Sequence, residues 1–289
     1  MSVFGNYLLP VAALLMLGGC TAEVLPERDS VPIQLMARME EGPVTRAGTA
    51  VQDTQFASGE TFNAYFPTGA SVTNTTFQTV DGSGNTECSG TAPYMQVGVS
   101  SCTVHAYYPS SVNQSSASFS VALDQRTDAG YKASDLMYAS ATVTKAGASA
   151  TGSLTFNHRM SKIVVTAVPG SGVASITAIR IVGGKRTINV ATPLSCTLGS
   201  TLSDAITTVS SLSMWSGESA ESVSCAALIP PQTISGDFLQ IDTNLGTATY
   251  SLDSKAFAQG SSYQFTITVK TVDIGARTGY TAGGHENWN

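Results

Sequence analysis

The chain has 289 residues, with 14 Lys and Arg, 20 Asp and Glu, a net charge of −6 and 42% hydrophobic residues. So few basic residues leave no positive stripe to bind nucleic acid, and the hydrophobic content is too high for a disordered protein. At roughly 150 residues per domain, the length predicts two domains.

Residues 8–17 form a short apolar run that ends in Leu17-Gly18-Gly19-Cys20. The run is too short to cross a hydrocarbon core of about 30 Å, but it is typical of a signal peptide, here residues 1–19. It departs from the usual pattern because no Lys or Arg precedes it. Leu-Gly-Gly-Cys resembles a bacterial lipobox, in which the Cys is acylated and becomes the new N-terminus. We therefore expect a lipid on Cys20 to be the membrane attachment; the alternative is an ordinary small residue near a cleavage site.

Residues 31–39 alternate between apolar and polar side chains, which is typical of a half-buried β-strand. The residues that share the apolar face are Val31, Ile33, Leu35, Ala37 and Met39. The next ten residues contain charges, glycines and a proline, with Arg46 near their centre. The sequence thus predicts a first strand, then an exposed loop with a protease-accessible arginine, and then the body of the protein.

Short alternating runs separated by Gly-rich and Asp- or Asn-rich turns recur through the rest of the chain. They predict an all-β protein with two β-sandwich domains in tandem, residues 47–150 and 151–289. The small-residue stretch at 147–152 marks the expected join. A change of phase between Met160 and Ile163 indicates a bulge or bend in one strand. We find no convincing amphipathic helix; residues 200–210 are the nearest candidate.

Four cysteines follow the lipobox, and they are Cys88, Cys102, Cys196 and Cys225. Export would place them in an oxidising compartment, where disulfides persist. Three pairings are open. We expect Cys88–Cys102 and Cys196–Cys225, one bridge in each half, and the alternative is four free buried thiols.

The sequence lacks the patterns of known catalytic sites. Its three histidines, His105, His158 and His285, have no metal-ligand spacing, and there is no nucleophile elbow or glycine-rich phosphate loop. We therefore expect no enzyme, no cofactor and no metal. His158 is expected to be a hydrogen-bonded core or interface residue, and the tyrosines are expected to pack across the strands rather than to stack on sugars.

Several short motifs occur in one order along the whole chain. They are the lipobox at Cys20, the strand at 31–39, Thr45-Arg46-Ala47-Gly48, Ala106-Tyr107-Tyr108-Pro109, Asp135-Leu136-Met137-Tyr138-Ala139, the segments 156–163, 228–233 and 260–267, and Trp288. Together they resemble the fimbrillin family, the type V pilins of anaerobic oral and gut bacteria, and especially its Mfa-like branch.

This resemblance implies two transthyretin-like, Greek-key β-sandwich domains in a protein that is secreted as an outer-membrane lipoprotein. It also implies that a trypsin-like maturation protease cuts after Arg46, so that the mature chain begins at Ala47 and loses residues 20–46 with the first strand. Subunits of the family polymerise into cell-surface fimbriae by strand exchange. The implied partners are other fimbrial subunits, in a homo- or hetero-polymer, and a host protein or glycan receptor.

Loss of the first strand would leave a groove with unpaired backbone groups along its edges. Refilling it with four or five apolar side chains would yield a gross gain on the order of 10 kcal/mol, part of which is offset by ordering the incoming strand. The expected donor is the C-terminal segment, in which residues 271–274 resemble a strand. The glycines that follow make it a poor donor, which suits a tip or accessory subunit.

Two other functions remain open at this point. One is a permanently lipid-anchored surface lipoprotein that binds glycan or host protein, in which Cys20 stays attached. The other is a β-sandwich hydrolase, which requires two carboxylates about 5–10 Å apart in a cleft.

Overall fold

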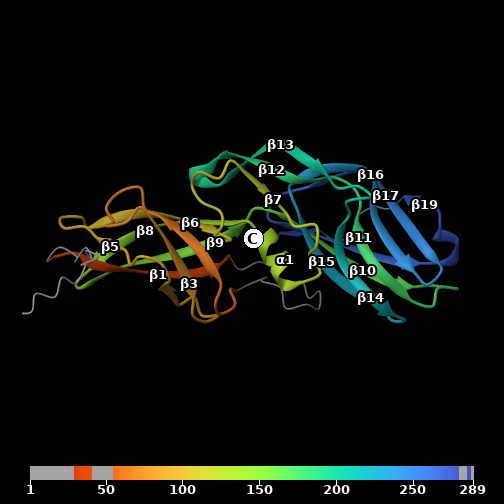
Figure 1. The fold of residues 1–289 in the computed structure, drawn as a ribbon, viewed down its shortest axis with the longest axis horizontal. Coiled ribbons are helices and arrows are strands. Elements are labelled where there is room, and N and C mark those ends of the chain that lie inside the picture. The colour runs from red at the N-terminus through yellow and green to blue at the C-terminus, as the bar shows by residue number, and fades with distance from the viewer. Residues whose placement is uncertain (1–28, 41–54, 280–284, 288–289) are drawn as a thin grey trace, which may run out of the picture.

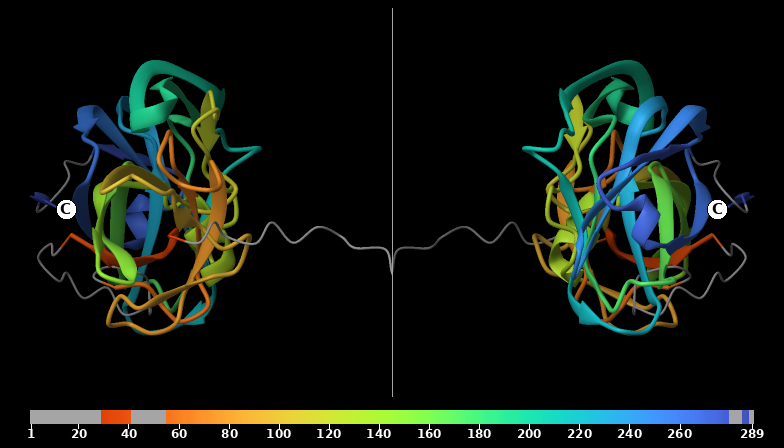
Figure 2. Two further views of the ribbon diagram at one scale, coloured as in Figure 1. Left: turned by 90° about the vertical axis from the view of Figure 1, so that its left-hand side faces the viewer. Right: turned by 90° about the vertical axis from the view of Figure 1, so that its right-hand side faces the viewer.

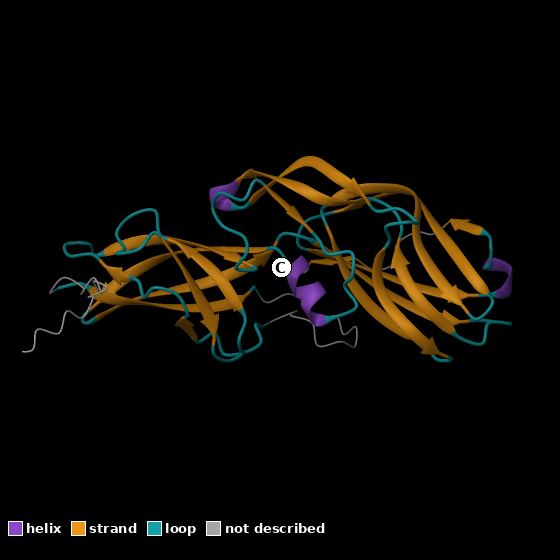
Figure 3. Cartoon of the chain, viewed as in Figure 1, coloured by secondary structure: helices purple, strands orange, loops and turns teal. Residues whose placement is uncertain are grey.

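A computed structural model describes residues 29–40, 55–279 and 285–287 of the chain. These residues form two lobes that lie end to end along the long axis of the molecule (Figure 1). The regular structure of both lobes is mainly β-strand (Figure 3), so the predicted all-β class is confirmed. Figure 2 shows the ribbon along the long axis, where the strands of the two lobes overlap in projection.

The N-terminal lobe is one eight-stranded sheet with the order β4-β3-β2-β6-β8-β9-β1-β5. Its strands are β1 (Val31–Met39), β2 (Thr61–Tyr65), β3 (Asn74–Thr79), β4 (Thr86–Cys88), β5 (Tyr94–Met95), β6 (Ser101–Tyr108), β8 (Met137–Ala146) and β9 (Ser149–His158). The sheet curls until its two ends meet, because Met36 of β1 bridges to Asn85 beside β4. The curled sheet encloses a core of its own, with the buried rings of Phe62, Phe77 and Phe156 inside.

The C-terminal lobe contains a four-stranded sheet, β15-β10-β18-β20, and a five-stranded sheet, β14-β11-β16-β17-β19. Their bounds are β10 (Ser161–Pro169), β11 (Ile176–Ile181), β14 (Leu212–Ser219), β15 (Val223–Ile229), β16 (Gln232–Thr243), β17 (Gly246–Phe257), β18 (Ser261–Val269), β19 (Arg277–Gly279) and β20 (His285–Asn287). Buried side chains of both sheets belong to one core cluster, as the packing of Phe238 on β16 against Phe265 on β18 illustrates. This lobe is therefore a β-sandwich.

A small third sheet, β13-β12-β7, connects the two lobes. Its strands are β7 (Ser118–Ser120), β12 (Lys185–Thr192) and β13 (Thr197–Ala205), and short helices lie nearby as α1 (Asp128–Ser134) and η1 (Pro193–Ser195). β12 and β13 extend over the upper side of the molecule toward the N-terminal lobe (Figure 1). There the Tyr107 hydroxyl on β6 donates a hydrogen bond of 2.7 Å to the Leu194 carbonyl of η1.

The segment between β6 and β8, residues 109–136, leaves the N-terminal lobe and packs against the other one. Phe119, Val121 and Leu136 of this segment belong to the core cluster of the C-terminal lobe. The buried Gln125 side chain accepts a hydrogen bond of 2.8 Å from the Leu228 amide and donates one of 2.9 Å to the Leu228 carbonyl. The two lobes are therefore interlocked, because residues from the first half of the sequence complete the core of the second.

This arrangement differs from the expected domain boundary at 150/151. Residues 147–148 are the turn of the β8–β9 hairpin within one sheet. The chain changes sheet between His158, which ends β9, and Ser161, which begins β10. The change of phase between Met160 and Ile163 is thus a change of strand and lobe, not a bulge.

Two further local predictions were wrong. Most of residues 200–210 lie in β13 and the bend after it, whereas the α-helix of the described residues is α1. This helix has seven residues and an N-cap at Thr127, whose side chain accepts a hydrogen bond from the Gly130 amide. Seven residues are too few to show a helical period in the sequence. Residues 271–273 form a 3-10 turn, η2 (Thr271–Asp273), in place of the expected strand.

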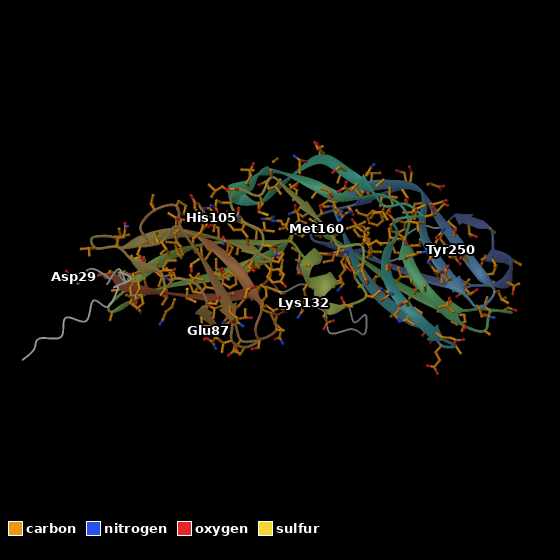
Figure 4. The ribbon with its side chains drawn as sticks, viewed as in Figure 1. Asp29, Glu87, His105, Lys132, Met160 and Tyr250 are labelled. Atoms are coloured by element: carbon orange, nitrogen blue, oxygen red, sulfur yellow. The ribbon has the colours of Figure 1, made fainter. Side chains whose placement is uncertain are left out.

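A buried hydrogen bond between two side chains lies at the junction of the lobes. His158 Nδ1 lies 2.8 Å from Asp135 Oδ1, and both side chains are 0% exposed. Asp135 caps the C-terminus of α1 and His158 ends β9. The prediction of a hydrogen-bonded core or interface histidine is therefore confirmed. Figure 4 labels Met160, which lies between β9 and β10, and Lys132 of α1.

We predict that Asp135→Ala lowers the free energy of unfolding by on the order of 3 kcal/mol, because it leaves the buried His158 without its acceptor. Asp135→Asn retains an oxygen acceptor, so it is expected to lose less. Urea unfolding followed by tryptophan fluorescence measures the difference. The matched control is Asp253→Ala at an exposed position of β17, which should change the free energy of unfolding by no more than about 0.5 kcal/mol. Equal losses in Asp135→Ala and in the control would contradict a stabilising role for Asp135.

Candidate functional site

The first strand of the chain is not an edge strand of the N-terminal sheet, because it has a neighbour on each side. β1 pairs in parallel with β9 on one side and antiparallel with β5 on the other. Figure 1 shows it in red-orange along the lower side of this lobe, next to β9. Both neighbours of β1 therefore lie more than fifty residues after it in the sequence.

Backbone hydrogen bonds hold β1 at both of its edges. Along β9 the register runs without interruption from Ile33 opposite Ala150 to Met39 opposite Phe156. On the opposite edge, the Ile33 amide donates to the Pro93 carbonyl and the Ala37 amide to the Gly84 carbonyl, each at 2.9 Å. If β1 left, unpaired N–H and C=O groups would remain along both flanks, and such groups are costly unless another strand pairs with them.

The side chains of β1 alternate as the sequence predicts. The five residues of the apolar face, Val31, Ile33, Leu35, Ala37 and Met39, are at most 8% exposed and belong to the core cluster of the N-terminal lobe. Gln34 and Arg38, which lie between them, are exposed. β1 thus supplies one wall of the hydrophobic core, and its bounds coincide with the predicted strand.

The covalent link between β1 and the body of the protein is the segment 41–54. A hollow of about 230 Å³ at the end of β1 is lined by Ala37, Met39, Gln55 and Phe56, among others. The chain thus resumes at residue 55 beside the point where β1 ends. Arg46 and Ala47, like Cys20, lie outside the described residues, so lipidation and cleavage remain predictions.

The four cysteines of the body are free thiols in the structure, and the expected pairs Cys88–Cys102 and Cys196–Cys225 are not formed. β3 and β2 separate Cys88 on β4 from Cys102 on β6, and three strand spacings amount to about 14 Å, twice the Cα separation of about 7 Å that a disulfide tolerates. Cys196 follows η1 and Cys225 lies on β15, in a different sheet. Burial raises the pKa of Cys196 to about 11 and that of Cys225 to about 12, so these thiols stay protonated at neutral pH.

Five of the eight tyrosines among the described residues pack in the cores, as expected, and they are Tyr107, Tyr108, Tyr131, Tyr250 and Tyr263. A partly exposed group remains on the N-terminal lobe, where His105 Nδ1 lies 2.7 Å from the Tyr138 hydroxyl. Within the described residues no group of three His, Cys, Asp or Glu side chains could hold a metal ion. Within the same residues no helix has the length and apolar character needed to cross a membrane.

No pattern in the sequence pointed to the residues that receive β1. These are the inward-facing residues of β9, namely Ala150, Gly152, Leu154 and Phe156. Gly152 belongs to the small-residue stretch that we took for a linker between domains. The alternation of β9 was visible from Leu154 onward, but nothing local in the sequence indicates that its neighbour is a parallel strand more than a hundred residues away.

Comparisons with known proteins find one family model and several solved structures. The model described as fimbrillin-like matches residues 44–282. A candidate cell adhesion protein from Bacteroides ovatus is 15% identical with a TM-score of 0.65, and the alignment covers 91% of this chain and 99% of that one. A candidate cell adhesion protein from Bacteroides uniformis is 16% identical with a TM-score of 0.62, covering 92% and 100%. One from Bacteroides fragilis is 14% identical with a TM-score of 0.54, covering 90% and 97%. These structures share the fold, and no curated protein sequence matches the chain.

We predict that native protein at pH 8 reacts with iodoacetamide at Cys88, which is partly exposed, and not at the buried Cys102, Cys196 and Cys225. All four are expected to react after denaturation without a reducing agent, because none is tied in a disulfide. Peptide mass mapping counts the label at each cysteine. A pair that reacts in denatured protein only after reduction would contradict the free-thiol structure.

Proposed function

The chain belongs to the fimbrillin-like family, and we propose that it is a subunit of a cell-surface fimbria that is exported as a lipoprotein and assembled by strand exchange. The family consists of structural proteins, which agrees with the expectation that the chain is not an enzyme. The observation that carries the proposal is the position of β1, a core strand paired on both edges and linked to the body through one segment.

A cut within residues 41–54 would turn β1 into a separate peptide. The segment that carries Arg46 follows β1 directly, and everything before residue 31 precedes the strand. One cut after Arg46 would therefore leave the strand, together with a lipid on Cys20, attached to the body by non-covalent contacts only. Loss of that peptide would release the subunit from the membrane and open the groove in the same step.

The groove would then accept a strand from another subunit. Its two flanks offer backbone hydrogen bonds, and its floor offers the apolar surface that the five inward side chains of β1 now cover. Addition of an extended segment to an open sheet edge is a recurrent mode of protein association. The partners in this proposal are other fimbrial subunits and a trypsin-like maturation protease, and an exposed fimbria would bind a host protein or glycan.

The C-terminal segment has a place of its own in the structure. β19 pairs with β17 in parallel and β20 pairs with β18 antiparallel, so both extend the sheets of the C-terminal lobe. To act as a donor this segment would first have to leave those sheets. We therefore propose that the chain accepts a strand more readily than it donates one, which suits a tip or accessory position in the fimbria.

The test is the N-terminus and intact mass of protein sheared from the surface of cells that express the full chain. Wild-type protein is expected to begin at Ala47 without a lipid, and Arg46→Gln is expected to retain residues 20–46. The matched control is Arg38→Gln. Arg38 lies within β1, whose backbone is paired on both edges, so a protease that needs an extended free segment does not reach it and processing should be unchanged.

A surface protein that begins at acylated Cys20 would contradict the proposal. In that case β1 would stay in its groove permanently, and the anchored lipoprotein that binds glycan or host protein would be the better function. The partly exposed rings of Tyr65, His105 and Tyr138 would then be the first place to look for a sugar.

A further inference from the structure

In three of the four residue pairs that face the core between β1 and β9, a large side chain lies opposite a small one; in the fourth pair, Met39 and Phe156 are both large. Leu35 lies opposite Gly152, and Ala37 lies opposite Leu154. A Cβ atom on Gly152 would stand 2.9 Å from Val143 Cγ2 and 3.3 Å from Leu35 Cδ2, which is too close for an ordinary contact. The space that a side chain at residue 152 would need is therefore already filled, by Val143 of β8 on one side and by Leu35 of β1 on the other.

At the next inward position the small residue is on β1 and the large residue is on β9. Leu154 is 1% exposed and occupies the space beside Ala37, which is also 1% exposed. A longer side chain at residue 37 would meet Leu154 inside a packed core, where added volume is destabilising. The third inward position of β1 thus requires a large side chain and the fourth requires a small one.

On the opposite edge of β1, a backbone contact holds the strand at Ala37. A Cβ atom on Gly84 would stand 3.0 Å from the Ala37 carbonyl oxygen, so the backbones approach closely there. Gly84 has a φ of +94°, a conformation that glycine adopts without strain. The close approach prevents β1 from moving sideways to make room for a larger residue at position 37.

We propose that this groove selects its replacement strand by the order of side-chain sizes. The occupant is a strand of another subunit that runs in the same direction as β1. It carries a large apolar residue at its third inward position and Ala or Gly at its fourth, with apolar residues at the other three. This inference rests on the strand exchange proposed above. Residues 152 and 154 of β9 determine the specificity, and the backbone hydrogen bonds, which any strand can make, do not.

The first experiment tests the size match in the intact chain, without any exchange. Ala37→Leu and Leu154→Ala are each expected to lower the urea midpoint of unfolding, the first by overpacking and the second by leaving a cavity. The double variant conserves volume, so its midpoint should lie above that of either single variant. The matched control combines Ala37→Leu with Val104→Ala, a buried residue of β6 in the same core cluster; its two losses should add. If the decreases in urea midpoint of the single variants add up in both double variants, the size match is overturned.

The second experiment tests selection by an open groove. Full-length protein with an engineered site for a specific protease within residues 41–54 is cut and given a fluorescent peptide of residues 31–39. Three unlabelled nonapeptides then compete: the native one, one with the residues at 35 and 37 exchanged, and one with the sequence reversed. All three have the same composition. The native peptide is expected to compete at least ten-fold better than either other peptide, which corresponds to about 1.4 kcal/mol.

The groove variants complete this test. Leu154→Ala should narrow the preference for the native over the exchanged peptide, and Val104→Ala should leave it unchanged. Equal competition by the three peptides would overturn the size selection while strand exchange stands. If the labelled peptide never enters the cut protein, strand exchange itself fails, and the selection fails with it.

Discussion

The two-sided pairing of β1 is the constraint on which the N-terminal lobe depends. Every backbone polar group of a buried strand needs a partner, and β1 finds its partners on β9 along one edge and on β5 and the Gly84 turn along the other. Its five inward side chains close the core of the lobe at the same time. The lobe is therefore complete only with a strand in this place, but the strand need not belong to the same polypeptide.

The C-terminal lobe closes its core in a different way. Its two sheets share a core, and the segment 109–136 closes part of that core from the N-terminal side. Gln125, bonded twice to Leu228, and the buried Asp135–His158 pair fasten this segment. A change in the groove would thus occur in a lobe that is fastened to its neighbour by these contacts.

The fold and the groove of β1 give different information about function. Family membership and the shared fold place the chain among fimbrillin-like proteins, but a fold alone does not state which strand enters the groove or from which partner. In our proposal, the side chains of the groove carry that information. A glycine at residue 152 and a leucine at residue 154 give the floor an uneven profile, and a profile of this kind distinguishes one apolar strand from another by packing, whereas backbone hydrogen bonds do not.

The sequence by itself determined the features that depend on local pattern. Alternation in residues 31–39 predicted both the bounds of β1 and its buried face, because a strand with one buried face has a period of two residues. The burial of His158 and the all-β class followed from the same kind of evidence. The predicted boundary at 150/151 rested on a stretch of small residues, and the expected disulfides rested on proximity along the chain. Both were poor guides here. Only the tertiary structure decided that β9 receives β1, that residues 109–136 belong to the other lobe, and that Cys88 and Cys102 lie three strands apart. Each of these depends on which distant strands become neighbours, and that choice is made by the packing of the whole core rather than by any short stretch of residues.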